Sequence, residues 1–194
     1  MTVYFVRHGQ TDWNAAGRLQ GQRDVPLNAT GRGQAEAVAE RLKAVAGADL
    51  AEAEFVASPL LRTRQTMEVL RASLDLAPGD YDVDDRLMEI NFGSWEGSTW
   101  AEIRRRDGGS ALARDRDRWG YRPPGERSES YAMLVERVRP AITDLRRPAV
   151  IVAHGGVARA ILVILGYASI REAPRMGIRQ GSVLVLDQSR WRWA

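Results

Sequence analysis

The sequence predicts an α/β fold, a three-layer αβα sandwich with a mainly parallel central sheet. Two observations predict it: short apolar runs recur along the chain, and most are followed by a stretch with helical spacing of apolar residues. A chain of 194 residues can bury one substantial core, which favours a single domain over residues 1–194. Hydrophobic residues make up 44% and charged residues 27%, as in ordinary globular proteins.

Strands are predicted where runs of Val, Ile, Phe or Tyr are bounded by polar residues or glycine. They are residues 3–6, 54–57, 149–153 and 181–186, with shorter extended pieces at 81–84 and 191–193. Residues 149–153 are the most strand-like run. The last piece, Trp191-Arg192-Trp193, is expected to pair as a hairpin with residues 181–186. Its tryptophans could also form a contact between two subunits of a homodimer.

Helices are predicted where apolar residues recur at three- and four-residue spacing. They follow Thr30, Ser58-Pro59, Thr99 and Ser130, and an apolar helix covers residues 157–165. Thr30 is expected to cap the first of these helices and Gly47 to end it. Thr99 and Glu102 have the spacing of a capping box. Pro140 lies within the helix after Ser130 and is expected to kink or restart it.

Residues 108–125 are rich in Gly, Arg, Asp and Pro and offer little to a core. They predict an insert or lid, within a region of about residues 95–128.

Composition excludes several classes of protein. Without cysteine the chain has no disulfide, thiolate nucleophile or cysteine-bound metal. No apolar run is long enough to span a membrane and the first residues do not resemble a signal peptide, so we expect a cytoplasmic protein without a membrane partner. Net charge is +3, and Lys43 is the sole lysine among many arginines. Residues 104–107 and 114–118 mix arginine with aspartate, which favours solvated helix faces over a nucleic-acid site.

The two histidines of the chain each precede a glycine at the carboxyl end of a predicted strand. In parallel sheets these ends meet at one edge, so His8 and His154 are expected there together. Arg7 beside His8 would repel a cation and attract a phosphate dianion. A metal site, with Glu89 as a third ligand, is the less supported alternative, because the chain has no cysteine and no His-x-x-x-His pair.

Two further residues fit phosphate chemistry. Arg62 follows Ser58 at a strand-to-helix turn, where backbone N–H groups can join its guanidinium around a phosphate. The alternative, a surface arginine, would place positive charge at the positive end of a helix dipole. Glu89 lies in the apolar stretch of residues 87–93, which favours a protonated carboxyl group and hence a proton donor. The alternative is that Glu89 is an exposed glutamate that pairs with Arg86.

Several blocks together resemble the histidine phosphatase superfamily, also called the phosphoglycerate mutase-like family. They are Arg7-His8-Gly9-Gln10-Thr11, Asn14, Gly17-Arg18, Gln20-Gly21, Asp24-x-Pro26-Leu27, Ser58-Pro59-Leu60-Leu61-Arg62-Thr63, Glu89-Ile90-Asn91-Phe92-Gly93, Glu129-Ser130-Tyr131 and His154-Gly155-Gly156. The blocks occur in family order from Val3 to about Leu165.

The resemblance implies a role for each matching residue. His8 would be the nucleophile that forms a phosphohistidine, and Glu89 would be the proton donor. Arg7, Arg62 and His154 would bind the phosphoryl oxygens, and Asn14 would add a hydrogen bond. Gln20, Gly21 and Gly155 would be further substrate-binding residues. The resemblance implies a small-molecule phosphate ester as substrate, and neither a metal nor a cofactor.

Two positions depart from the family pattern. Asn91 stands where many phosphatases of the family have aspartate, which removes a negative charge near Glu89. The Glu-Ser pair has two registers, Glu126 to Ser128 or Glu129-Ser130, and we prefer the second because a helix pattern starts at Tyr131.

The short insert resembles the phosphatase branch, which includes α-ribazole and broad-specificity phosphatases. The alternatives are a cofactor-dependent phosphoglycerate mutase, a catalytically silent phospho-ligand-binding protein of the same fold, and an RNA-processing protein.

Overall fold

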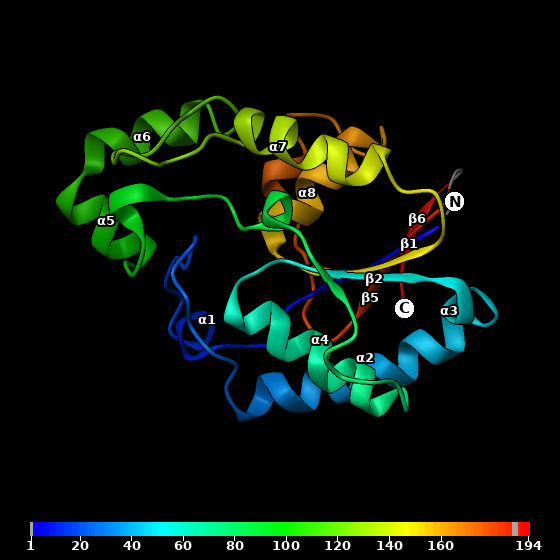
Figure 1. Cartoon of the computed structure of the whole chain (residues 1–194). Coiled ribbons are helices and arrows are strands. Elements are labelled where there is room, and N and C mark those ends of the chain that lie inside the picture. Colours follow the sequence, from blue (N-terminus) through cyan, green and yellow to red (C-terminus); the bar gives the residue numbers. More distant parts are fainter. Residues whose placement is uncertain (1, 188–189) are drawn as a thin grey trace.

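The computed structural model describes residues 2–187 and 190–194, and its framework is a six-stranded sheet with the strand order β3-β2-β4-β1-β5-β6 (Figure 1). The strands are β1 (Val3–Arg7), β2 (Glu54–Ala57), β3 (Asp82–Val83), β4 (Ala149–Ala153), β5 (Val183–Leu186) and β6 (Trp191–Trp193). The pairs β1–β4, β2–β4 and β2–β3 are parallel, whereas β5 runs antiparallel to both β1 and β6. The mainly parallel sheet and the terminal hairpin are therefore confirmed.

Helices cover both faces of this sheet. They are α1 (Asp12–Ala15), α2 (Ala29–Ala46), α3 (Asp49–Glu52), α4 (Leu61–Ser73), α5 (Trp100–Arg106), α6 (Gly108–Arg116), α7 (Tyr131–Thr143) and α8 (Gly155–Ile164), with 3-10 turns η1 (Asp85–Leu87), η2 (Gly93–Trp95) and η3 (Ala173–Arg175). Figure 1 shows α2 and α4 on one face of the sheet and α7 and α8 on the other, which confirms the predicted three layers.

Alternating side chains of β1 supply two separate cores. Tyr4 and Val6 pack into the core that α2 and α4 share, and Val3 and Phe5 pack into the core beneath α7 and α8. All four are nearly inaccessible to solvent. A strand buried on both faces has no polar side to show, which is why residues 3–6 form a continuous apolar run.

Two local predictions were wrong. The first long helix starts at Ala29, one residue before the predicted cap, because the Asn28 side chain accepts a hydrogen bond from the Gly31 N–H. Pro140 does not restart its helix, since α7 runs as one helix from Tyr131 to Thr143 with Pro140 inside it. Ahead of α2 the chain also forms α1, a single turn closed by a capping box between Thr11 and Asn14.

The segment predicted as an insert is more ordered than its composition indicates. Within it α6 folds against α5, and Trp95, Ile103 and Ala111 form a third small core. Thr99 caps α5 through the predicted capping box with Glu102. Apolar side chains spaced along residues 95–111, rather than a continuous run, build this core.

The parallel strands bring three polar side chains to one edge of the sheet. His8 follows β1, Ser58 follows β2 and His154 follows β4. The His8 N–H donates to the Ala153 carbonyl oxygen at 2.9 Å, which locks the ends of β1 and β4 together. This edge carries the site.

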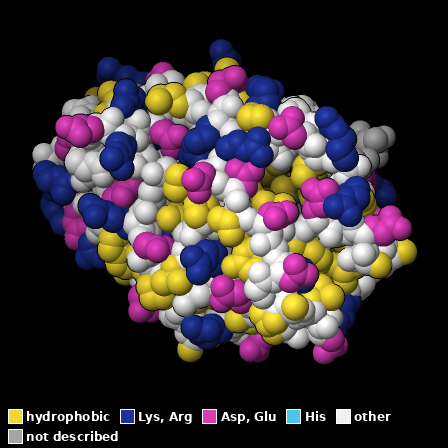
Figure 2. Space-filling view, in the orientation of Figure 1, with side chains coloured by type: hydrophobic (Ala, Val, Ile, Leu, Met, Phe, Trp, Pro, Cys, Tyr) yellow, Lys and Arg dark blue, Asp and Glu magenta, His cyan; other side chains and the backbone are white. Residues whose placement is uncertain are grey.

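The surface mixes charges of both signs. On the face shown in Figure 2, Arg and Lys side chains are interspersed with Asp and Glu. Within residues 2–187 and 190–194, none of the helices has the length and apolar character needed to span a bilayer.

Candidate active site

His8 lies at the end of β1 with 3% of its surface exposed. Its Nδ1 is 2.8 Å from the Gly9 carbonyl oxygen, so in the tautomer that donates this bond Nε2 carries the lone pair. Burial holds the pKa of His8 well below its ordinary value, and the charges of Arg62 and Arg7 lower it further. This environment therefore favours the neutral form of the ring.

His154 lies directly beside His8, with the ring centroids 5.2 Å apart and the planes tilted by 59°. Its Nε2 is 2.8 Å from the Ser58 hydroxyl. Its Nδ1 is buried and finds no hydrogen-bond partner among the residues that the structure describes. Burial, followed by the charge of Arg62, lowers the pKa of His154 as well. When the Ser58 hydroxyl donates to Nε2, the Nδ1–H remains as a donor for a ligand.

Two arginines supply the positive charge of the site. Arg7 donates through Nη1 to the Ile178 carbonyl oxygen at 2.8 Å. Arg62 is fully buried and donates through Nη1 and Nη2 to the carbonyl oxygens of Arg23 and Gly21 at 2.7 and 2.8 Å. In both guanidinium groups the Nε atom is buried and unpartnered within the described part of the chain. Burial lowers the pKa of Arg62 to about 10, so it stays charged at neutral pH.

The carboxylate of Glu89 is fixed by backbone donors. Its Oε1 accepts from the Ile90 N–H at 2.9 Å and from the Gly156 N–H, in the first turn of α8, at 3.0 Å. A Cβ at position 156 would overlap this carboxylate, so the close approach requires glycine there. The surroundings are not apolar as predicted, because Leu87 and Ile90 turn into the core while Glu89 lines a cavity with arginines.

The loop around α1 positions the remaining predicted ligands. The Asn14 Oδ1 accepts from the Thr11 N–H and from the Gln180 amide, both at 3.2 Å, which leaves Nδ2 as the donor of this side chain. Gln180 also donates to the His8 carbonyl oxygen at 3.1 Å. Gln20 accepts from the Thr11 hydroxyl at 3.0 Å. Thr11 and Gln180 thus support the site, although neither was predicted to be a site residue.

A cavity of about 160 Å³ forms between these groups. It is lined by Arg7, His8, Asn14, Arg18, Leu19, Gln20, Gly21, Arg62, Glu89, Phe92, Gly155 and Arg159. The structure therefore places every predicted site residue in this lining except His154, whose ring lies beside that of His8 at a centroid distance of 5.2 Å. Arg18, Leu19, Phe92 and Arg159 were missed. Arg159 follows Gly155 by four residues on α8, a spacing that places both on one helix face and could have revealed it.

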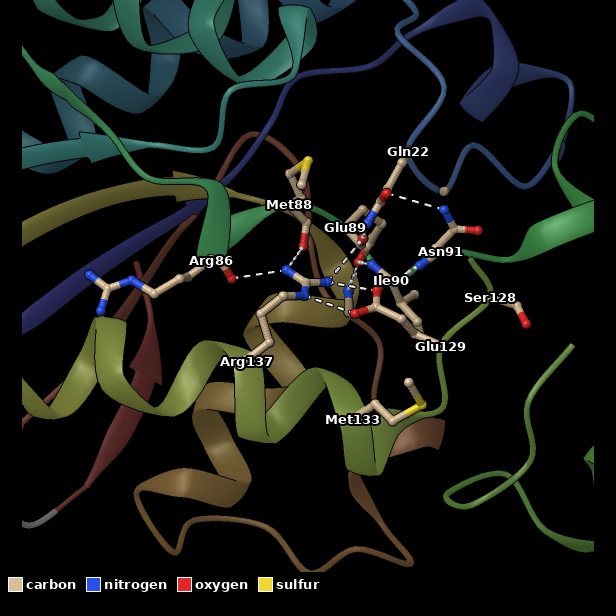
Figure 3. A network of polar contacts seen from close by, with 12 residues as sticks. Gln22, Arg86, Met88, Glu89, Ile90, Asn91, Ser128, Glu129, Met133 and Arg137 are labelled. Carbon is tan, nitrogen blue, oxygen red and sulfur yellow. Dashed lines mark hydrogen bonds and ion pairs between the residues drawn. The ribbon is translucent and has the colours of Figure 1, made fainter. Parts of the chain in front are cut away.

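An ion pair supports the segment that carries Glu89 (Figure 3). Arg137 on α7 pairs with Glu129 and donates to the carbonyl oxygens of Met88 and Glu89 at 2.9 and 3.3 Å. Glu129 in turn accepts from the Asn91 N–H at 3.0 Å. Ser130 caps α7, so the preferred Glu129-Ser130 register agrees with the structure.

A larger cavity of about 590 Å³ lies along the edge strand β3, at the other end of the sheet order from β6. Its lining includes Asp82, Asp84, Asp85 and Asp144. Carboxylates repel a phosphate dianion, so this cavity does not compete for the same ligand.

In residues 2–187 and 190–194, the acidic and histidine side chains nowhere gather into a group of three or more that could hold a metal ion. The metal-free site expected from the sequence stays a prediction.

The chain matches a protein family and several known proteins. The model of the family described as the histidine phosphatase superfamily (branch 1) matches residues 3–194. The chain is 34% identical to a probable phosphoglycerate mutase GpmB of Shigella dysenteriae, a match that covers 100% of this chain and 87% of that protein. It is 35% identical to a glucosyl-3-phosphoglycerate phosphatase of Mycolicibacterium vanbaalenii, over 90% of this chain and 78% of the relative.

Solved structures extend the likeness to the fold. The mycobacterial glucosyl-3-phosphoglycerate phosphatase Rv2419c, in complex with VO3, superimposes with a TM-score of 0.82 at 34% identity, covering 100% of this chain and 96% of that one. A second structure, TTHB049 from Thermus thermophilus, gives a TM-score of 0.72 at 34% identity, over 98% and 95% of the two chains.

Proposed function

This chain belongs to the histidine phosphatase superfamily (branch 1), and we propose that it is a metal-independent phosphatase that hydrolyses small-molecule phosphate monoesters through a phosphohistidine on His8. One observation carries the proposal: the buried imidazole of His8 lies near Arg7 and the fully buried Arg62, whose Nε atoms are buried and unpartnered within the described residues. A phosphoryl group would satisfy those donors, and its charge would balance the buried guanidinium groups.

In the first step the His8 Nε2 lone pair attacks phosphorus and the phosphorus–oxygen bond to the leaving group breaks. Arg7, Arg62 and the His154 Nδ1–H bind the non-bridging oxygens, where negative charge resides during transfer. The leaving oxygen takes its proton from Glu89, and the phosphoryl group remains on His8.

In the second step water attacks the phosphohistidine. The Glu89 carboxylate accepts a proton from this water, the phosphorus–nitrogen bond breaks, and inorganic phosphate leaves. The electron pair of that bond returns to His8 Nε2, and Glu89 is protonated again. Each residue thus ends in its starting state.

Phosphoglycerate mutase activity is the second candidate, favoured by the relative that is named a probable phosphoglycerate mutase and that matches the whole of this chain. A mutase must keep its intermediate and return the phosphoryl group to it. We place phosphatase activity first because the predicted insert is short, and because the chain is similar to a phosphatase at a TM-score of 0.82.

A cytoplasmic location and a small-molecule partner, rather than nucleic acid, complete the proposal. The mixture of arginine with acidic residues on the surface supports the second point (Figure 2).

The test is phosphate release from a panel of phosphorylated metabolites by the purified chain, with 3-phosphoglycerate also followed for isomerisation. Release that depends on His8 supports the phosphatase, whereas isomerisation faster than release would favour the mutase. Tight phosphate-ester binding without turnover of any substrate would indicate a silent binding protein.

A further inference from the structure

A second cavity of about 440 Å³ adjoins the phosphate site. Leu19, Phe92 and Arg159 line both cavities, so the second begins where the first ends. The rest of its lining comes mainly from α5, α6 and their neighbours: Trp100, Arg104, Arg114, Arg118, Tyr131 and Pro174. A group bound at His8 would therefore extend its other end into this space.

The lining of the second cavity carries four arginines and no acidic side chain. We call Arg104, Arg114, Arg118 and Arg159 the arginine pocket. One carboxylate, Asp115, pairs with three of them, at 3.5 Å from Arg104, 3.2 Å from Arg114 and 3.1 Å from Arg118. One negative charge cannot balance three positive charges, so the pocket keeps an excess of positive charge.

The fourth arginine adds to this excess. Arg159 donates through Nε to the Met176 carbonyl oxygen at 2.9 Å and through Nη1 to the Tyr131 hydroxyl at 3.2 Å. Both acceptors are uncharged groups. The Arg118 Nε is buried and has no partner among the described residues. Arg118 therefore has a donor left for a ligand.

Aromatic side chains hold these cations in place and give the cavity an apolar wall. The Arg114 guanidinium lies 4.5 Å from the centre of the Trp100 ring, within the range of a cation–π contact. Burial, followed by the charge of Arg118, lowers the pKa of Arg114, as like charges held close together require.

Polar contacts of Arg18 connect the phosphate site to α5 and the residues before it. Arg18, which lines the phosphate site, forms an ion pair of 3.0 Å with Glu102 on α5 and donates to the Gly97 carbonyl oxygen at 2.6 Å. Arg18 also forms a β-bridge with Thr99. The arginine pocket is thus held at a set position relative to His8.

We propose that the arginine pocket binds a second anionic group on the substrate, so that the preferred substrate is a phosphate monoester whose leaving group itself bears a phosphate or a carboxylate. This inference rests on the proposed function. The hydrolysed phosphate lies at His8, the carbon skeleton crosses Phe92 and Trp100, and the second anion meets Arg114 and Arg118.

The test compares substrates that differ in the second anion. Propane-1,3-diol bisphosphate is paired with 3-hydroxypropyl phosphate, and 3-phosphoglycerate with glycerol 3-phosphate, while p-nitrophenyl phosphate reports the reaction at His8 alone. We expect kcat/KM at least about tenfold higher for the member of a pair that carries the second anion, the value of one good charge-assisted hydrogen bond. The two pairs distinguish a phosphate from a carboxylate as the second group.

Arg118→Gln should lower kcat/KM for the substrates with a second anion by about tenfold, which removes most of this preference. The change should appear in KM more than in kcat, and turnover of p-nitrophenyl phosphate should stay unchanged. The matched control is Arg116→Gln, which removes the same charge from an exposed position of α6 outside the arginine pocket. The Arg116→Gln variant should change kcat/KM neither for the substrates with a second anion nor for p-nitrophenyl phosphate. Equal loss with both variants would indicate a general field effect and overturn the assignment.

The outcomes separate this inference from the proposed function. If p-nitrophenyl phosphate is hydrolysed but neither pair shows a preference, the arginine pocket is not an anion subsite while the phosphatase stands. If no ester is hydrolysed, the proposed function fails, and calorimetric binding of the bisphosphate to wild-type and Arg118→Gln protein still tests the pocket. Equal affinity of the two proteins would overturn it.

Discussion

Arg137 and Glu129 form a two-point ion pair, with Nε–Oε1 at 2.8 Å and Nη2–Oε2 at 2.7 Å. The same guanidinium donates to the backbone carbonyls of Arg86, Met88 and Glu89 (Figure 3). The segment that carries Glu89, the proposed proton donor, is therefore held from α7, a helix far along the chain. This makes Arg137 a positioning residue that acts through the backbone of Glu89.

Replacing Arg137 with Met should lower kcat about tenfold at unchanged KM, because Glu89 loses its backbone support. Unfolding free energy should fall by about 2 kcal/mol, since the largely buried Glu129 is left without its partner. Steady-state kinetics and urea unfolding measure the two effects. The control, Arg139→Met, removes an exposed cation paired with Glu136 and should change neither. Loss of stability with kcat intact would show that Arg137 is only structural.

Stability should fall as pH drops from 7.5 to 5.5. Burial holds the pKa of both His8 and His154 well below the usual 6.5, so below that pH the unfolded chain binds protons that the folded chain does not. Each histidine should lower the free energy of unfolding by about 1.4 kcal/mol between pH 7.5 and 5.5. This interval lies above the pH range in which carboxylates ordinarily titrate. Urea unfolding at several pH values measures the sum. The His8→Gln variant should keep about half of the dependence, and a flat wild-type profile would contradict the neutral histidine pair.

Glu89→Gln should depend on the leaving group. An alkyl phosphate needs a proton on its leaving oxygen, so kcat should fall by about a hundredfold or more. A nitrophenolate leaves without a proton, so formation of the phosphohistidine from p-nitrophenyl phosphate should be affected much less. Rapid-mixing kinetics should then show a burst of nitrophenol followed by slow turnover, because the second step lacks its base. Equal losses for both leaving groups in the first step would exclude Glu89 as the proton donor.

Chelation should leave activity intact. The proposed charge stabilisation comes from Arg7, Arg62 and His154 rather than from a metal ion. Phosphate release after dialysis against EDTA checks this directly. Loss of activity that a divalent cation restores would overturn the metal-free mechanism.

Most of the site could be predicted from the sequence because its residues sit where strands end. His8, Ser58 and His154 follow β1, β2 and β4, and parallel pairing alone brings them to one edge. The arginine pocket could not be predicted in this way. Arg114 and Arg118 line it from the segment whose small core is formed by Trp95, Ile103 and Ala111. These three residues are too widely spaced to form a periodic apolar run in the sequence.

The exact ends of the helices could not be predicted from the sequence either. Asn28 rather than Thr30 caps α2, since both are good capping residues and only the tertiary path of the loop decides between them. Pro140 lacks the N–H that would bond back along α7, yet the helix continues past it to Thr143.

A phosphohistidine on His8 can be detected by rapid-quench mass spectrometry of the Glu89→Gln protein mixed with p-nitrophenyl phosphate. We expect one acid-labile phosphoryl group on the peptide that contains His8, formed at the rate of the nitrophenol burst and absent in the additional variant His8→Ala. A phosphoryl group on any other residue, or undiminished turnover by His8→Ala, would contradict it.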